Sequence, residues 1–200
     1  MNIAERLREA LADGARRTPE LLPGDSSDLL ADPSRPSTPA AVLVPVVDRP
    51  DPTVILTLRT NTVRSHAGQV SFPGGRIDPG DAGPVEAALR EAEEEIGLPR
   101  NRVEVIGTAD VYLTITGYQV TPVLAVVPPD LPLKPQPSEV AAIFEAPLRH
   151  LLDERQQRVR TVEWRGAERT YFEIEWEDRR IWGATAAMIV NLSRRLQLVS

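Results

Sequence analysis

The segment PVEAALREAEEEIGL, at residues 84–98, restricts the folds open to this chain more than any other stretch. Its apolar residues recur at three- and four-residue spacing and form one stripe, made of Val85, Ala88, Leu89, Ala92 and Ile96. Pro84 suits the first turn of a helix, and Gly97 suits its C-terminal cap. A helix with one apolar stripe buries that stripe against another layer, so the segment predicts a layered domain.

The second layer is predicted by apolar, β-branched segments that read as strands. They lie at 40–47, at 53–60 and across 103–129, with breaks expected at Gly107 and Gly117. Residues 61–83 hold many glycines and predict a loop with a short strand near 69–72. A β-hairpin is expected across 160–183, and further helices at 2–17, from about 147, and from 183 to the end. The mixture predicts an α/β or α+β sandwich over 37–200, preceded by an N-terminal helix and a Pro/Ser-rich loop over 1–36.

Composition excludes several classes of function. The chain has no cysteine, so any metal site must use oxygen ligands or the two histidines, His66 and His150. The net charge of −6, with acids and bases mixed along the chain, argues against a protein that grips a nucleic acid backbone. No apolar run approaches the length that spans a membrane, and the N-terminus lacks the pattern of a secretory signal. A cytoplasmic location is the resulting expectation, and a homodimer is left open.

The sequence REAEEEIGL, at 90–98, crowds four glutamates onto one part of this helix. A rotation of about 100° per residue places Glu91, Glu94 and Glu95 in one sector, away from the apolar stripe. Like charges at this spacing repel, and a divalent cation with hard oxygen ligands reverses that repulsion. The helix alone favours an ordinary solvated acidic face. The preceding FPGG, where Gly74 and Gly75 allow a close backbone approach to a ligand, favours Mg²⁺ or Mn²⁺.

These residues resemble the Nudix box, G-x5-E-x7-R-E-U-x-E-E-x-G-U, in which U is aliphatic. The second half matches at each fixed position, which are Arg90, Glu91, Ala92, Glu94, Glu95, Gly97 and Leu98. The first half departs from the pattern: five residues after Gly75 stands Asp81 rather than glutamate, and one extra residue then precedes Arg90. Asp81 is therefore an uncertain counterpart of the first glutamate of the box, and Glu86 is the less favoured alternative.

The stretch before the box, ILTLRTNTVRSHAGQVSFPGG, resembles the additional motif of the coenzyme A pyrophosphatase subgroup. The matching residues are Leu56, Thr57, Arg59, Arg64, Gly68, Phe72, Pro73, Gly74 and Gly75. The resemblance covers about residues 40 to 195. It implies a Nudix-type α/β/α sandwich with a mixed sheet and a loop–helix–loop catalytic motif. It also implies hydrolysis of the diphosphate of coenzyme A to adenosine 3′,5′-bisphosphate and 4′-phosphopantetheine.

The resemblance further implies roles for individual residues. Glu91, Glu94 and Glu95, with the backbone carbonyl of Gly75, would hold Mg²⁺ or Mn²⁺. Arg90 would hold one carboxylate in place, although its plainer role is an i, i+4 partner of Glu94 or Glu86. The general base is left open between a glutamate of the box and Glu139, which is otherwise an exposed acid at a strand start.

Substrate binding is expected from Gly74, Gly75, Arg59 and Arg64. The two guanidinium groups suit coenzyme A, which carries a 3′-phosphate as well as its diphosphate, with structural salt bridges as the alternative. A small nucleotide is thus the expected partner. Two further hypotheses stay open: a Nudix pyrophosphatase acting on ADP-ribose, a dinucleotide or a nucleoside triphosphate, and a Nudix-fold binding module without turnover.

Overall fold

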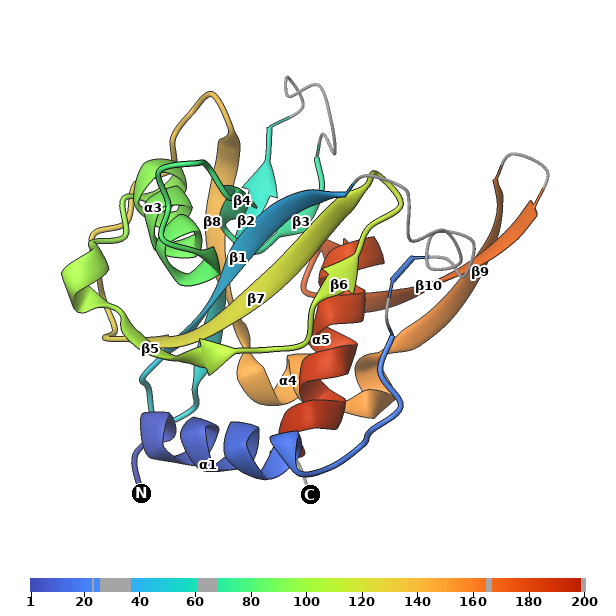
Figure 1. Cartoon of the computed structure of the whole chain (residues 1–200), viewed down its shortest axis with the longest axis horizontal. Coiled ribbons are helices and arrows are strands. Elements are labelled where there is room, and N and C mark those ends of the chain that lie inside the picture. Colours follow the sequence, from blue (N-terminus) through green and yellow to red (C-terminus); the bar gives the residue numbers. More distant parts are fainter. Residues whose placement is uncertain (23, 26–36, 61–67, 165–166, 199–200) are drawn as a thin grey trace.

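The computed structural model describes residues 1–22, 24–25, 37–60, 68–164 and 167–198. Its centre is a mixed eight-stranded sheet (Figure 1). The main strand order is β3-β2-β1-β7-β5, with β4 paired to β1, β6 to β7 and β8 to β2. The strands are β1 (Thr38–Val47), β2 (Thr53–Arg59), β3 (Val70–Ser71), β4 (Gly74–Arg76), β5 (Glu104–Thr108), β6 (Tyr112–Leu113), β7 (Tyr118–Val127) and β8 (Val140–Pro147).

The two longest strands, β1 and β7, run parallel in the middle of the sheet, and the other pairs are antiparallel. A central strand with both faces covered reads as a nearly continuous apolar run. In β1, Ala41 and Leu43 belong to one hydrophobic core, and Ala40 and Val44 belong to the other. The sheet is therefore the middle layer of three, as the sequence pattern predicts.

Helices cover the two faces unequally (Figure 1). On one face lies α3 (Pro84–Ile96), followed by the short 3₁₀ turn η1 (Arg100–Arg102). On the other face lie α1 (Ile3–Ala15), α4 (Leu148–Leu152) and α5 (Gly183–Leu196), with the turn η2 (Glu154–Gln156). A second, three-stranded sheet packs beside α5 and consists of β9 (Arg158–Trp164), β10 (Ala167–Trp176) and β11 (Arg179–Trp182).

The expected mixed α+β sandwich is confirmed, and three local predictions need correction. The predicted break at Gly107 is wrong, because Gly107 lies inside β5 at a register shift and the chain leaves the strand after Thr108. A Cβ atom on Gly107 would lie 2.9 Å from Leu11 of α1, so this glycine allows a helix to approach the sheet. The hairpin near the C-terminus carries a third strand, β11, and the glycine-rich loop contains a strand, β4, that periodicity did not predict.

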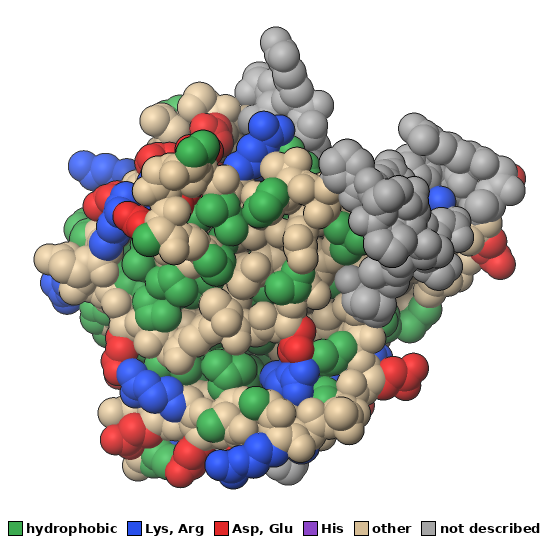
Figure 2. Space-filling model, in the orientation of Figure 1, with side chains coloured by type: hydrophobic (Ala, Val, Ile, Leu, Met, Phe, Trp, Pro, Cys, Tyr) green, Lys and Arg blue, Asp and Glu red, His purple; other side chains and the backbone are tan. Residues whose placement is uncertain are grey.

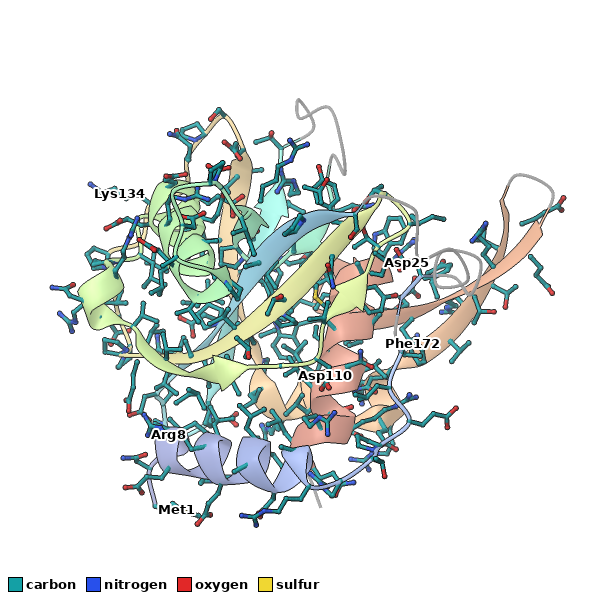
Figure 3. The ribbon with its side chains drawn as sticks, viewed as in Figure 1. Met1, Arg8, Asp25, Asp110, Lys134 and Phe172 are labelled. Carbon is teal, nitrogen blue, oxygen red and sulfur yellow. The ribbon has the colours of Figure 1, made fainter. Side chains whose placement is uncertain are left out.

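The N-terminal helix packs against the C-terminal one. Arg195 of α5 pairs with Asp110 through two short contacts and also donates to the carbonyl of Gly14, at the end of α1. Arg8 of α1 pairs with Glu104 of β5, and Figure 3 labels Arg8 and Asp110 on this side of the molecule. Among the residues that the structure describes, no helix is long and apolar enough to cross a membrane.

Candidate active site

The acidic part of α3 packs against β4, the short strand that contains Gly74 and Gly75. Gly75 pairs with Ala41 of β1, and a Cβ atom on Gly75 would lie 2.6 Å from the carboxylate carbon of Glu91. The N–H of Gly74 donates to Oε2 of Glu95 over 3.1 Å. A Cβ atom on Gly74 would lie 2.4 Å from the carbonyl oxygen of Ala41. Glycine is therefore required at position 74, where a Cβ atom would meet the backbone of β1, and at position 75 a side chain would displace the carboxylate of Glu91.

Arg90 organises the outer side of this turn. Its Nε and Nη2 donate to the two carboxylate oxygens of Asp81 over 3.0 and 2.9 Å. Its Nη1 donates to Glu91 over 2.9 Å and to Glu94 over 3.2 Å. Nη2 also donates to the carbonyl of Arg76 over 3.0 Å. The hydrogen bonds to Asp81 are the main cause that raises the pKa of Arg90 above its ordinary value, so the guanidinium stays charged.

Asp81, which the irregular first half of the box leaves without a clear counterpart, is a nearly buried partner of Arg90. The side chain of Asp81 is 5% exposed and also accepts from the N–H of Asp78 over 2.8 Å. The hydrogen bond from Arg90 holds the pKa of Asp81 below its usual range. Glu86 instead accepts from the N–H of Ala82, close to the start of α3. Asp81, and not Glu86, therefore pairs with Arg90.

Arg59, at the end of β2, reaches the same turn. Its Nη1 lies 3.5 Å from Oε1 of Glu95, and its buried Nε has no hydrogen-bond partner in the described part of the chain. The hairpin that carries Arg59 is closed by backbone bonds, since Arg59 N donates to Gln69 O and Gly68 N donates to Arg59 O. The sequence motif before the box and the box itself thus meet at Glu95.

Burial sets the electrostatics of the two inner glutamates. Glu95 is 3% exposed, and its desolvation raises its pKa to about 7. Burial likewise raises the pKa of Glu91, against the opposing effect of Arg90. The negative charge of Glu139 adds to the rise at both residues. Burial and the neighbouring acids therefore both oppose ionisation of Glu91 and Glu95.

Glu139 and Glu94 occupy the exposed rim. The loop that carries Glu139 is fastened to the end of α3, because Lys134 N donates to Ile96 O and Gln136 N donates to Glu95 O. Figure 3 labels Lys134 beside α3, and Figure 2 shows acidic and basic side chains mixed over this region. Glu94 is 60% exposed at its side chain and contacts Arg90 alone among the interactions in the described chain. Glu94 is thus less enclosed than Glu91 and Glu95.

The donor set fits a divalent cation of the hard, oxygen-binding kind. The carboxylates of Glu91 and Glu95, the third carboxylate of Glu94 and the adjacent glycine backbone offer the hard oxygen donors that Mg²⁺ or Mn²⁺ prefers. Within the described ranges, no three acidic or histidine side chains already stand in a ligand cluster. The carboxylates are held instead by Arg90 and Arg59, so a cation would complete its coordination with backbone, water or phosphate oxygens.

The remaining predicted residues fall outside this group. Arg64 and His66 lie outside the described residues. His150 lies on α4, where its Nε2 contacts the carbonyl of Glu175 and its ring packs on Trp176, so it belongs to the opposite face of the sheet. Phe72 is 2% exposed and is a core residue.

A family model described as NUDIX domain matches residues 37–179. The chain belongs to the Nudix family. Curated relatives named uncharacterized Nudix hydrolase NudL, from Escherichia coli strain K12 and Shigella boydii serotype 4, are each 45% identical over 157 residues, which is 78% of this chain and 82% of the relative. A solved Nudix hydrolase from M. smegmatis, RenU, is 26% identical with a TM-score of 0.50, over 60% of this chain and 76% of that one. The chain is thus a Nudix hydrolase in class.

Two features of this Nudix site escaped sequence reasoning. The sequence pattern alone leaves the bidentate partner of Arg90 open, although an acid nine residues before the arginine is a usable signal once the loop is allowed an insertion. The contact between Arg59 and Glu95 joins residues 36 positions apart and depends on how β2 is placed beside α3, for which the local sequence carries no signal.

Proposed function

We propose that this Nudix hydrolase cleaves the diphosphate of coenzyme A or its thioesters with Mg²⁺ or Mn²⁺, giving adenosine 3′,5′-bisphosphate and (acyl-)4′-phosphopantetheine. The observation that carries the proposal is the meeting of two motifs at one carboxylate. Glu95 receives the N–H of Gly74 and lies 3.5 Å from Arg59, and both of those residues belong to the motif that resembles coenzyme A pyrophosphatases. The reaction class rests on the family, and the substrate rests on this motif.

Nudix hydrolases generally use divalent metal ions, and Glu91, Glu95 and the Gly75 carbonyl are the proposed ligands, with Glu94 at the rim. When bound, such an ion supplies positive charge to the diphosphate and lowers the pKa of a coordinated water. Arg90 keeps Glu91 and Glu94 in position through its own fixed contacts to Asp81. Glu139 or a box glutamate would accept the proton of the attacking water. The exposed position of Glu139 at the rim leaves it accessible to solvent and substrate.

A substrate panel tests the proposal. Coenzyme A, dephospho-coenzyme A, ADP-ribose, a diadenosine polyphosphate and a nucleoside triphosphate are compared with each metal, and the products are identified by mass. Hydrolysis in ¹⁸O-labelled water shows which phosphorus the water attacks. The expected result is the highest kcat/KM for coenzyme A or a thioester of it. A higher kcat/KM for ADP-ribose or a dinucleotide would replace the substrate and keep the class, and failure to cleave any diphosphate would refute both.

A further inference from the structure

Arg59 is incompletely paired for a buried guanidinium. Its contact with Glu95 is 3.5 Å long, which is an ion pair beyond good hydrogen-bond distance. Its Nε has no hydrogen-bond partner among the described residues and is shielded from solvent. Buried donors are normally paired, because leaving one unpaired costs free energy. Glu95 alone therefore does not satisfy Arg59.

The two oxygens of Glu95 have different partners. Oε2 accepts the backbone N–H of Gly74, whereas Oε1 is the oxygen that Arg59 approaches. Oε2 already accepts a backbone donor that β1 holds in place, so Oε1 is the more open oxygen for a cation, and a cation bound there would be repelled by the positive guanidinium of Arg59. The guanidinium of Arg59 and a divalent cation therefore compete for Oε1.

We propose that Arg59 is an exchangeable counterion of Glu95. In the metal-free protein it holds Oε1, and when a divalent cation takes that oxygen Arg59 moves to a phosphate oxygen of the bound diphosphate. This inference rests on the proposed function and adds a coupling to it: metal binding releases the residue that recognises the substrate. The phosphate also supplies an acceptor for the unpaired Nε, since guanidinium groups bind phosphate through two parallel donors.

The exchange assigns Arg59 to the diphosphate rather than to the 3′-phosphate. A side chain that touches Glu95 lies at the centre where the diphosphate must be cleaved. Coenzyme A and dephospho-coenzyme A share that diphosphate and differ only in the 3′-phosphate. Removing Arg59 should therefore reduce kcat/KM for both by the same factor.

The first experiment measures Mn²⁺ binding by calorimetry without substrate. Arg59→Ala should bind Mn²⁺ roughly three- to tenfold more tightly than the parent protein, because the competing cation is gone. Arg8→Ala removes the same charge from an Arg–Glu pair on the opposite face and should change the affinity by less than about twofold. Unchanged or weaker binding in Arg59→Ala would overturn the exchange while leaving the proposed function intact. A parent protein that binds no Mn²⁺ would refute the proposed function, and the exchange with it.

The second experiment measures methylenediphosphonate binding to the Mn²⁺-loaded protein. Arg59→Ala should weaken this binding by roughly tenfold or more, because a charge-assisted pair to phosphate is lost. Arg59→Gln, which keeps a polar side chain but is shorter and uncharged, should behave alike, and thermal unfolding shows that each variant is folded. Equal affinity in parent and variants would overturn the proposal, as would a larger kcat/KM loss for coenzyme A than for dephospho-coenzyme A.

Discussion

Two arginines reach the acidic turn of α3, and they are held in different ways. Arg90 makes five hydrogen bonds, two of them to Asp81 and one to the backbone of Arg76. Within the described part of the chain, Arg59 makes one ion pair, to Glu95, and buries an Nε without a hydrogen-bond partner. A guanidinium with a full set of partners fixes geometry, whereas one with a single long contact can change partner at little cost. Arg90 therefore holds the carboxylates in place, and Arg59 is a group that can move to the substrate.

The largest effect on kcat/KM is expected from replacing Glu95, the acidic partner of Arg59. Glu95→Gln removes a charged oxygen from the proposed metal site and should lower kcat/KM by about a thousandfold or more. Steady-state kinetics with Mg²⁺ and Mn²⁺ measure this, with circular dichroism to show an intact fold. Glu93→Gln changes an exposed glutamate of the same helix that pairs with Arg100, and it serves as the matched control. Normal turnover in Glu95→Gln would remove Glu95 from the metal site.

The partner of Arg90 should matter less, because it acts through another residue. Asp81→Asn keeps the shape but loses the charge that anchors Arg90, and we expect roughly a 10- to 100-fold loss in Mn²⁺ affinity or kcat/KM. Asp78→Asn is the control, since Asp78 is 62% exposed and lies 3.7 Å from Arg90. An effect of Asp81→Asn as small as that of Asp78→Asn would show that Arg90 is positioned without Asp81.

The surroundings of Arg90 and Arg59 also show what the local sequence can and cannot predict. The α3 helix, its Gly97 cap in the left-handed conformation and the long strands were predicted because each is encoded by neighbouring residues. The pairing of β4 with β1 was not, because three residues rich in glycine carry no strand periodicity. Helix periodicity predicts Glu91, Glu94 and Glu95 in one sector, but it does not predict that Glu94 is more exposed than Glu91, which follows from how β4 covers the helix.

The two acids should respond to pH with opposite signs. Arg90 lowers the pKa of Asp81 in the folded protein below its value in the unfolded chain. The ionised Asp81 therefore stabilises the fold above the unfolded pKa, and this stabilisation is lost as the pH falls through the folded pKa. Glu95 has its pKa raised to about 7 from 4.5, so the folded protein binds more protons than the unfolded chain between these values. Stability contributed by neutral Glu95 is therefore lost as the pH rises through this window.

Unfolding of the metal-free protein across pH measures this difference. Glu95→Gln should be more stable than the parent by on the order of 1–3 kcal/mol at pH 8 and nearly equal to it at pH 4. Asp81→Asn should lose stability relative to the parent at pH 8, and the difference should shrink in acid. A Glu95→Gln protein that is less stable than the parent at pH 8 would show that the carboxylate is well compensated in the folded state.

The smallest effect tests the comparison most directly, because it keeps the charge of each arginine and changes only its shape. Lysine cannot reproduce the fork by which Arg90 binds both oxygens of Asp81 while reaching Glu91, so Arg90→Lys should lower kcat/KM by roughly tenfold. Arg59 offers Glu95 little beyond its charge, so Arg59→Lys should leave Mn²⁺ affinity within about twofold of the parent. Calorimetry and kinetics on the two variants side by side provide the measurement. If Arg59→Lys changed Mn²⁺ affinity as strongly as Arg59→Ala, the guanidinium geometry would be fixed at Glu95, and Arg59 would be a second scaffold rather than an exchangeable group.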